Sequence, residues 1–178
     1  MIPRRSFDPR SIGGLVLWLD DSQTAREWSA KFGSSAVQTA TNNQPTVSSI
    51  GARPALSFDG INDTLSLPVT TLSAWHAFAV VNPATSTTQT VIHLTSSGTQ
   101  SFTLSSSASG LAVLSASGSP STSAAFYGVD GRIGAGWSGG SLKNFYKGLI
   151  GEVLVYDATL SSPQATAITR YLSAKWGL

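Results

Sequence analysis

The C-terminal stretch from residue 148 to residue 178 constrains the fold more than any other part of the sequence. Residues 148–157 are mostly apolar and rich in β-branched side chains, which is typical of a strand. With the two-residue period of a strand, Glu152, Leu154 and Tyr156 fall on one face. Val153 and Val155 fall on the other. The pattern therefore predicts a strand with two distinct faces near the end of the chain.

A helix is expected directly after this strand. Ser161 followed by Gln164 matches a capping box, and Pro163 lies in the first turn, where its missing N–H costs little. Gly177 stands where a helix commonly ends. The apolar face of this helix would consist of Ala165, Ile168, Leu172 and Trp176. The sequence thus predicts one capped, amphipathic, C-terminal helix that can cover a sheet.

The rest of the chain predicts many short strands separated by Gly, Ser, Asn and Pro turns. Residues 15–19 form a continuous apolar run, which predicts a strand buried on both faces. Residues 28–43 read as an extended surface segment with Trp28 as its one anchor, and Asn82-Pro83 reads as a strand break. The expected strands cover residues 15–19, 53–58, 64–67, 77–81, 90–94, 101–104, 111–114, 132–137 and 144–156, with a bend at 148–151. This succession predicts an all-β, two-sheet antiparallel jelly-roll sandwich with a short C-terminal α-helix.

Composition narrows the classes of function. The 178 residues suffice for one domain, which we expect at residues 11–178 after an N-terminal arm at residues 1–10. A net charge of +2, with scattered basic residues, argues against nucleic acid as a partner. The chain has no cysteine, so disulfides and thiolate chemistry are excluded. No apolar run has the length of a signal peptide or a membrane span, which predicts synthesis in the cytoplasm and no membrane contact.

Five segments, taken in order, resemble a known superfamily. They are residues 11–20 (SIGGLVLWLD), 53–63 (RPALSFDGIND), 78–81 (FAVV), 148–160 and 170–178 (RYLSAKWGL). Their order resembles the concanavalin A-like lectin/glucanase superfamily, in particular its laminin-G-like jelly-roll domains of phage and bacterial type. The resemblance implies two curved antiparallel sheets whose first and last strands lie close together. It implies no particular activity, because the superfamily contains lectins, hydrolases, adhesion modules and virion surface proteins.

A glycoside hydrolase needs two carboxylates on either side of the scissile bond. The chain has two glutamates, Glu27 and Glu152, and neither has an acidic neighbour two or four residues further on. A lone Glu152 beside a sheet edge is more often solvated or ion-paired than catalytic. We therefore expect no catalytic residues and no enzymatic activity, with glycoside hydrolysis as a remote alternative.

Calcium is the one cofactor that the sequence leaves open. Asp59, Asn62 and Asp63 could supply oxygen ligands, with Asp20 or Asp21 nearby in space. The alternative is a tight turn, because Asp-Gly and Asn-Asp pairs are what such turns require.

The histidines give no comparable signal for a metal. The chain has two, and no third ligand lies at metal-binding spacing, so no zinc site is expected. One of them, His93, lies inside an apolar run and is expected in a core or an interface.

Aromatic side chains supply candidate sugar-stacking residues. Trp75, Tyr127 and Trp137 could stack on sugar rings if they reach a sheet face or a loop tip, although large aromatic residues are more often core residues. Trp18 and Trp176 are expected in the core.

The N-terminal arm is short, extended and basic. Arg4, Arg5 and Arg10 lie among prolines and could bind an acidic neighbour in an assembly. The alternative is a frayed terminus.

Together these observations favour a non-enzymatic virion protein of a bacteriophage. We expect a capsid decoration (cement) or tail-associated protein that is made in the host cytoplasm, binds a capsid or tail protein and self-associates on the particle surface. The alternative is a carbohydrate-binding adhesin at a bacterial or viral surface, whose partners would be surface glycans.

Overall fold

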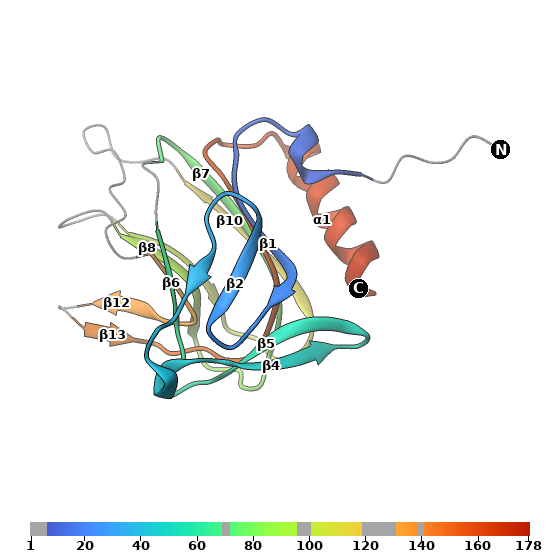
Figure 1. Ribbon diagram of the computed structural model, residues 1–178. Coiled ribbons are helices and arrows are strands. Elements are labelled where there is room, and N and C mark those ends of the chain that lie inside the picture. The colour runs from blue at the N-terminus through green and yellow to red at the C-terminus, as the bar shows by residue number, and fades with distance from the viewer. Residues whose placement is uncertain (1–6, 69–71, 96–100, 119–130, 139–140) are drawn as a thin grey trace.

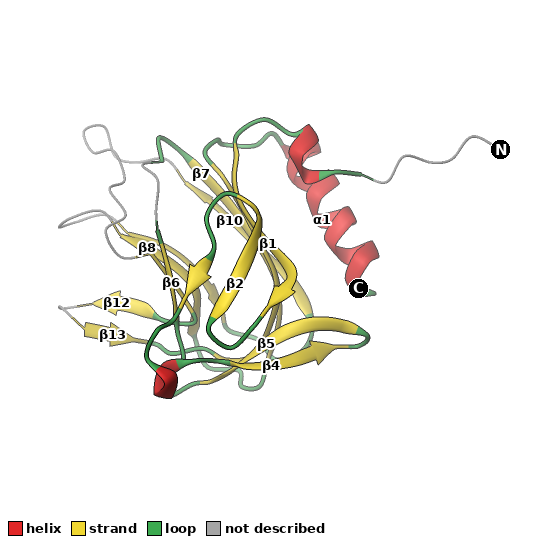
Figure 2. Ribbon diagram, in the orientation of Figure 1, coloured by secondary structure: helices red, strands yellow, loops and turns green. Residues whose placement is uncertain are grey.

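The computed structural model describes residues 7–68, 72–95, 101–118, 131–138 and 141–178. Two antiparallel β-layers pack together, and one α-helix near the C-terminus lies on the outside of one layer (Figure 1). Figure 2 shows how far strands outweigh helix among the described residues. The predicted all-β sandwich with one C-terminal helix is confirmed. No described helix has the length and apolar character needed to cross a membrane.

The first layer, here called the helix-side sheet, has the C-terminal strand at its centre. Its strands are β10 (Ala112–Gly118), β7 (Trp75–Pro83), β14 (Lys147–Tyr156), β1 (Leu15–Gln23), β5 (Arg53–Asp59) and β4 (Thr46–Ile50). One edge of β14 pairs with β7, and the other pairs with β1 near Tyr156 and with β5 near Lys147. The first and last strands of the sandwich are therefore neighbours, as the resemblance implied.

The second layer, here called the second sheet, continues from the first through β2 (Glu27–Phe32). Its strands are β3 (Ala36–Val37), β6 (Leu65–Leu67), β11 (Gly131–Ile133), β8 (Gln89–Thr95) and β9 (Ser101–Ser106). A separate hairpin joins β12 (Gly136–Ser138) to β13 (Ser141–Lys143), and short 3₁₀ turns lie at Pro9–Ser11 and Thr41–Asn43.

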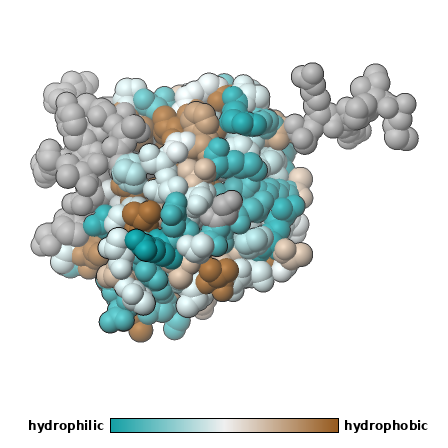
Figure 3. All heavy atoms as spheres, viewed as in Figure 1, coloured by the Kyte–Doolittle hydropathy of each residue, from teal (hydrophilic) through white to brown (hydrophobic). Residues whose placement is uncertain are grey.

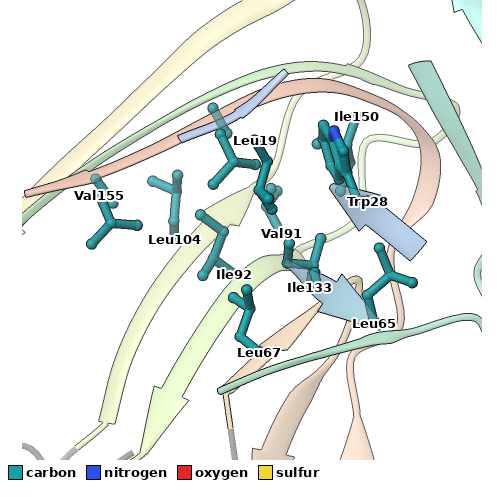
Figure 4. Packing of buried hydrophobic residues seen from close by; sticks show 14 of the residues in the cluster. Leu19, Trp28, Leu65, Leu67, Val91, Ile92, Leu104, Ile133, Ile150 and Val155 are labelled. Carbon is teal, nitrogen blue, oxygen red and sulfur yellow. The ribbon is translucent and has the colours of Figure 1, made fainter. Parts of the chain in front are cut away.

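The sandwich core lies between the two layers (Figure 4). Leu19 and Trp28 reach it from the helix-side sheet and its continuation, and neither is exposed. Ile92 and Ile133 reach it from the second sheet. Trp28 also donates its indole N–H to the carbonyl of Asp20 at 2.7 Å. The prediction that Trp28 is an anchor is confirmed, although the segment around it forms β2 and β3.

A bulge in β14 decides which residues face the helix. The register against β7 shifts between Ile150 and Glu152, so Gly151 is an extra residue in the strand. Ile150 therefore packs in the sandwich core, whereas Glu152 faces the other side of the sheet. Beyond the bulge, Leu154 lies on the helix side and Val153 in the sandwich core, as the sequence predicts.

The helix α1 (Ser162–Trp176) covers the outer face of the helix-side sheet (Figure 1). At its start the Gln164 side-chain oxygen accepts the Ser161 backbone N–H at 2.9 Å, and at its end Gly177 adopts a left-handed φ of 76°. The buried face of the helix consists of Ile168, Leu172 and Trp176. The capped amphipathic helix is confirmed.

Two local expectations are wrong, and one strand was not expected. The predicted strand at 132–137 is divided into β11 and β12, because Gly134 has a φ of 86° between them. The strand β7 continues through Asn82 and includes Pro83 instead of ending before them. Residues 46–50 form strand β4, which the sequence did not indicate.

Candidate functional site

A row of polar side chains crosses the second sheet on the face away from the sandwich core. Antiparallel register places Ser66 of β6 opposite Arg132 of β11, Arg132 opposite His93 of β8, and His93 opposite Thr103 of β9. Residues directly opposite each other in such pairs share a face of the sheet. We call these four residues the polar row.

The residue next to each of these four in the sequence points to the opposite, inner face of the sheet and is apolar. Leu65, Ile133, Ile92 and Leu104 pair with one another in the same way. All of them lie in the sandwich core and are at most 3% exposed. Because the inner face is fixed by this burial, the polar row must face outward.

His93 is the most tightly enclosed member of the polar row. It is 3% exposed, and its Nδ1 lies 2.9 Å from the Thr103 hydroxyl. Its Nε2 is buried and has no hydrogen-bond partner in the structure. Burial lowers the pKa of His93 below its ordinary value. A neutral imidazole has one donating and one accepting nitrogen, so the role of Nε2 depends on which role Nδ1 takes toward Thr103.

Arg132 brings positive charge to the middle of the row. Its side chain is half-buried, and one terminal nitrogen donates to the Gly131 carbonyl at 3.0 Å. A guanidinium carries five N–H donors in a planar fork that matches a carboxylate. Ser66 is half-buried beside it, and Thr103 at the other end of the row is exposed. The row therefore presents two hydroxyls, an imidazole and a guanidinium on adjacent strands.

The sequence did not indicate this site. His93 was expected in a core or an interface; it is buried, but on the face of the second sheet away from the sandwich core, and Arg132 and Ser66 were not singled out. These residues come from strands far apart in the sequence, and only the strand register brings them together.

The other concentration of charge is the buried carboxylate of Glu152, under the helix. Its Oε1 accepts from the Trp18 indole at 2.8 Å and from the Tyr171 hydroxyl at 3.2 Å. Its Oε2 accepts from the Trp176 indole at 2.7 Å and lies 2.9 Å from Lys175 Nζ. Glu152 thus joins β1 and β14 to the helix through four side chains.

Asp20 completes this cluster. It forms ion pairs with Lys175 and, at 3.1 Å, with Lys31, so Lys175 lies between two carboxylates. Burial raises the pKa of Glu152, and the negative charge of Asp20 adds to that effect. Burial also acts to raise the pKa of Asp20, but the hydrogen bonds from Lys175 and Lys31 outweigh it and lower that pKa.

This cluster is built to hold the helix. Glu152 has no exposed surface and Asp20 is 2% exposed, so a substrate cannot reach either carboxylate in this arrangement. The expected ion pairing of Glu152 is confirmed, whereas its expected position beside a sheet edge is wrong, because β14 is a central strand. Asp20, which with Asp21 was a candidate to lie near the Asp59 turn, is ion-paired with Lys175 and Lys31.

The calcium candidates lie in the turn after β5. Asp59 Oδ1 accepts backbone N–H groups from Ile61, Asn62 and Asp63, and Asp63 Oδ2 accepts the Asp59 N–H at 2.9 Å. These bonds are those of a tight turn. Among the described residues, no group of three or more His, Asp and Glu side chains could hold a metal ion. Calcium binding stays a prediction, which melting curves with calcium and with a chelator can check.

The predicted sugar-stacking aromatics do not form one described surface. Trp75 is half-buried against the sandwich core, and its indole packs over Gly118, where an added Cβ would lie 2.7 Å from the ring. The backbone of Trp137 pairs with Leu142 in the β12–β13 hairpin. Tyr127 lies outside the described residues. Trp18 and Trp176 are buried, as predicted.

Of the three arginines in the predicted assembly contact, Arg4 and Arg5 lie outside the described residues. Arg10 is exposed and forms a bidentate ion pair with Asp8, in which Nη2 donates to Oδ2 at 2.6 Å and Nε donates to Oδ1 at 3.0 Å. The adjoining Phe7 packs against Tyr171 of the helix, with ring centroids 5.6 Å apart. The end of the N-terminal arm is therefore docked on the domain.

No family model matches the chain, and no curated protein matches its sequence. Solved structures do match it. A sialidase of Trypanosoma rangeli in complex with 2,3-difluorosialic acid superimposes with a TM-score of 0.64 at 13% identity, over 92% of this chain and 33% of that chain. The same sialidase in complex with sialic acid gives a TM-score of 0.55 at 15% identity, with the same coverage.

These likenesses show the fold alone, which is a β-sandwich. The chain spans about one third of the length of the sialidase that it matches.

They also correct two expectations. The predicted bacteriophage virion protein and the predicted lack of enzymatic activity are contradicted, because the solved structures that match 92% of this chain include those of an enzyme, a sialidase. The carbohydrate-related part of the expectation is supported at the level of the fold.

Proposed function

We propose that this chain is a glycan-recognition domain that serves a carbohydrate-active enzyme, and that it binds sugar on the outer face of the second sheet. The polar row is the observation that carries the proposal. Sugars are recognised by hydroxyl, imidazole and guanidinium groups at fixed spacing, and the row supplies these groups from adjacent strands. With neighbouring strands about 4.8 Å apart, the row spans about 14 Å from β6 to β9.

Three features support this location. The side chains of the row stand on a sheet whose inner face is fully packed, so their positions are held by the core. The exposed Thr103 hydroxyl lies 2.9 Å from Nδ1 of the buried His93, so a buried neighbour supports its position in the row. The carboxylates of Glu152 and Asp20, in contrast, are both paired with Lys175 and are inaccessible.

The laminin-G-like subdivision of the fold is part of the same proposal. It rests on the order of the quoted sequence segments and on the pairing of the first and last strands.

A glycan array followed by calorimetry on the best ligand tests the proposal. We expect binding that weakens when Thr103 is changed to Val, because Thr103 is exposed and its hydroxyl belongs to the row. The matched control is Thr46→Val, since Thr46 is exposed on β4 in the other sheet. An array without any ligand would overturn the proposal, and so would equal loss of affinity in the two variants.

A further inference from the structure

We propose that the sugar-binding face continues beyond the polar row onto Glu27 and Val37, and that its ligand is a linear chain of neutral sugars. We call these two residues the row extension. This inference rests on the proposed function, because it assigns a ligand class to the same face of the second sheet. The contacts that it adds are those of the row extension, and it assigns no contact to Arg132.

The row extension lies in line with the polar row. Antiparallel register places Glu27 of β2 opposite Val37 of β3, and Val37 opposite Ser66 of β6. Residues directly opposite each other share a face of the sheet. On the inner face, Trp28 and Ala36 pair with each other in the same way and have no exposed surface. The row extension must therefore point outward, as the polar row does.

The two ends of this line are its most accessible parts. Glu27 is exposed and Val37 is 38% exposed, whereas His93 in the polar row is 3% exposed. Thr103, at the far end of the line, is exposed. With neighbouring strands about 4.8 Å apart, the six strands from β2 to β9 set the two ends about 24 Å apart. A single sugar ring is too short to reach both ends, whereas an extended chain of several rings is long enough.

The two side chains of the row extension match the two kinds of surface on a neutral sugar. The Glu27 carboxylate is an acceptor, so it takes hydrogen bonds from sugar hydroxyls and repels a carboxylated sugar. Its Oε1 accepts the Ser29 hydroxyl at 3.3 Å, which orients the carboxylate while the side chain stays exposed. The exposed methyl groups of Val37 can cover the C–H face of a sugar ring. A neutral chain can use both contacts, whereas an acidic chain meets a like charge at Glu27.

Backbone hydrogen bonds hold the row extension in place before a ligand binds. The Glu27 N–H donates to the Thr24 hydroxyl at 2.9 Å, and the Glu27 carbonyl accepts the Thr24 N–H at 2.7 Å. Next to Val37, the Gln38 N–H donates to the Arg26 carbonyl at 2.8 Å. A ligand that binds to a fixed backbone of this kind has little ordering cost to offset.

Calorimetry with oligosaccharides of increasing length tests the inference. The probes are cello-, xylo- and chito-oligosaccharides from disaccharide to hexasaccharide, with oligogalacturonides as the acidic series. We expect at least one neutral series to gain about tenfold in affinity with length and to bind as one hexasaccharide per protein, and the acidic series to show no such gain. The absence of a gain in every neutral series, or an equal gain in the acidic series, would overturn this inference. The proposed function fails separately, if the glycan array shows no ligand at all.

Variants at the two ends of the line identify the contacts. Glu27→Gln should lower affinity for the hexasaccharide about fivefold, and Val37→Ser should lower it about threefold. Their matched controls are Asp21→Asn and Val47→Ser, because both residues are exposed on strands of the other sheet. Thr103→Val should also reduce the gain with length, since the chain then keeps its contacts at one end alone. If Thr103→Val weakened binding while Glu27→Gln and Val37→Ser equalled their controls, the row extension would be wrong and the proposed function would stand.

Discussion

At the scale of single residues, Glu152 shows how much one buried carboxylate can hold together. Two tryptophan indoles and a tyrosine hydroxyl donate hydrogen bonds to it, and a lysine forms an ion pair with it. The indole of Trp18 and the ring of Tyr171 also pack edge to face, with centroids 6.4 Å apart. A buried charge with this many donors determines how the helix seats on the sheet.

The first prediction concerns Glu152→Ala. Removing the carboxylate leaves the Trp18 and Trp176 N–H groups without their acceptor and leaves Lys175 beside Asp20 alone, so we expect a loss of about 3–5 kcal/mol in the free energy of unfolding. Urea denaturation measures this loss. Glu152→Gln should lose less, because it retains an acceptor. Glu27→Ala is the control, since Glu27 is exposed, and a similar loss there would contradict the argument.

The second prediction concerns pH. His76 is 8% exposed, stacks on Phe78 with ring centroids 4.6 Å apart, and has a buried Nδ1 without a partner. Burial lowers the pKa of His76 below 6.5, so the unfolded chain binds a proton more readily than the folded one. This histidine therefore contributes stability above pH 6.5 that is lost as the pH falls through its folded-state pKa.

His76→Phe isolates this contribution. The variant keeps an aromatic ring over Phe78 and removes the titrating group, while His93 and the carboxylates titrate as before. We expect urea midpoints of the wild type to fall more steeply between pH 7 and about pH 5 than those of the variant. Parallel pH profiles would rule out this role for His76.

Contacts between individual side chains were the feature that the sequence predicted least well. The sequence allowed Glu152 to be ion-paired but could not name Lys175, Trp18 or Asp20 as its neighbours. Those contacts depend on the packing of a helix over a sheet, and the polar row depends on strand register. The spacing of residues along the chain specifies neither the helix packing nor the strand register, because several registers satisfy the same alternation of apolar residues.

At the scale of elements, the bulge at Gly151 has the largest consequence. It reverses the alternation of β14, which sends Ile150 into the sandwich core and Glu152 toward the helix. The glycine also makes room for the helix, because an added Cβ would lie 2.5 Å from the Trp176 ring. The strand β14 and the helix therefore pack closely against each other at Gly151.

The third prediction concerns Gly151→Ala. The added methyl group must displace Trp176, and overpacking of this kind costs about 1–3 kcal/mol. Thermal unfolding measures the loss, and tryptophan fluorescence reports the displacement. The control is Gly13→Ala, because nothing lies within 4 Å of a Cβ at Gly13. An unchanged melting temperature for Gly151→Ala would show that the ring can shift at no cost.

Elements with strong local signals were predicted well. The helix has its cap residues and its apolar spacing in one stretch, and strands such as β1 and β14 are apolar on both faces. Strand β2 was missed because Trp28 is its one fully buried residue, and β4 was missed because Ile50 is the one buried residue in it. A strand that pairs by its backbone while exposing most side chains leaves no apolar period to detect.

At the scale of the whole molecule, the helix-side sheet has two apolar faces. One forms the sandwich core, and the other is covered by the helix and by Phe7 of the N-terminal segment. On the face in Figure 3 the apolar residues are scattered among polar ones, with no single large apolar patch among the atoms that are coloured. The helix therefore shields the outer apolar face of the helix-side sheet from water.

The fourth prediction concerns a chain that ends at Leu160. Without the helix, Phe78, Val80 and Leu154 would face water together, so we expect aggregation or self-association in size-exclusion chromatography and increased binding of a hydrophobic dye. A chain that lacks Leu178 alone is the control, because that residue is 47% exposed. A monodisperse monomer without the helix would contradict this account.

The pairing of β1 with β14 also has a consequence for how the protein is made. Leu15 lies against Tyr156, and the strands between them in the sequence fill both layers of the sandwich. During synthesis on the ribosome, β1 stays unpaired at this edge until β14 has emerged. Because contacts between distant parts of a chain form slowly, translation is the period in which exposed early strands are most open to misassembly. The pairing of β1 with β14 thus makes the emergence of β14 the event that permits the sandwich to close.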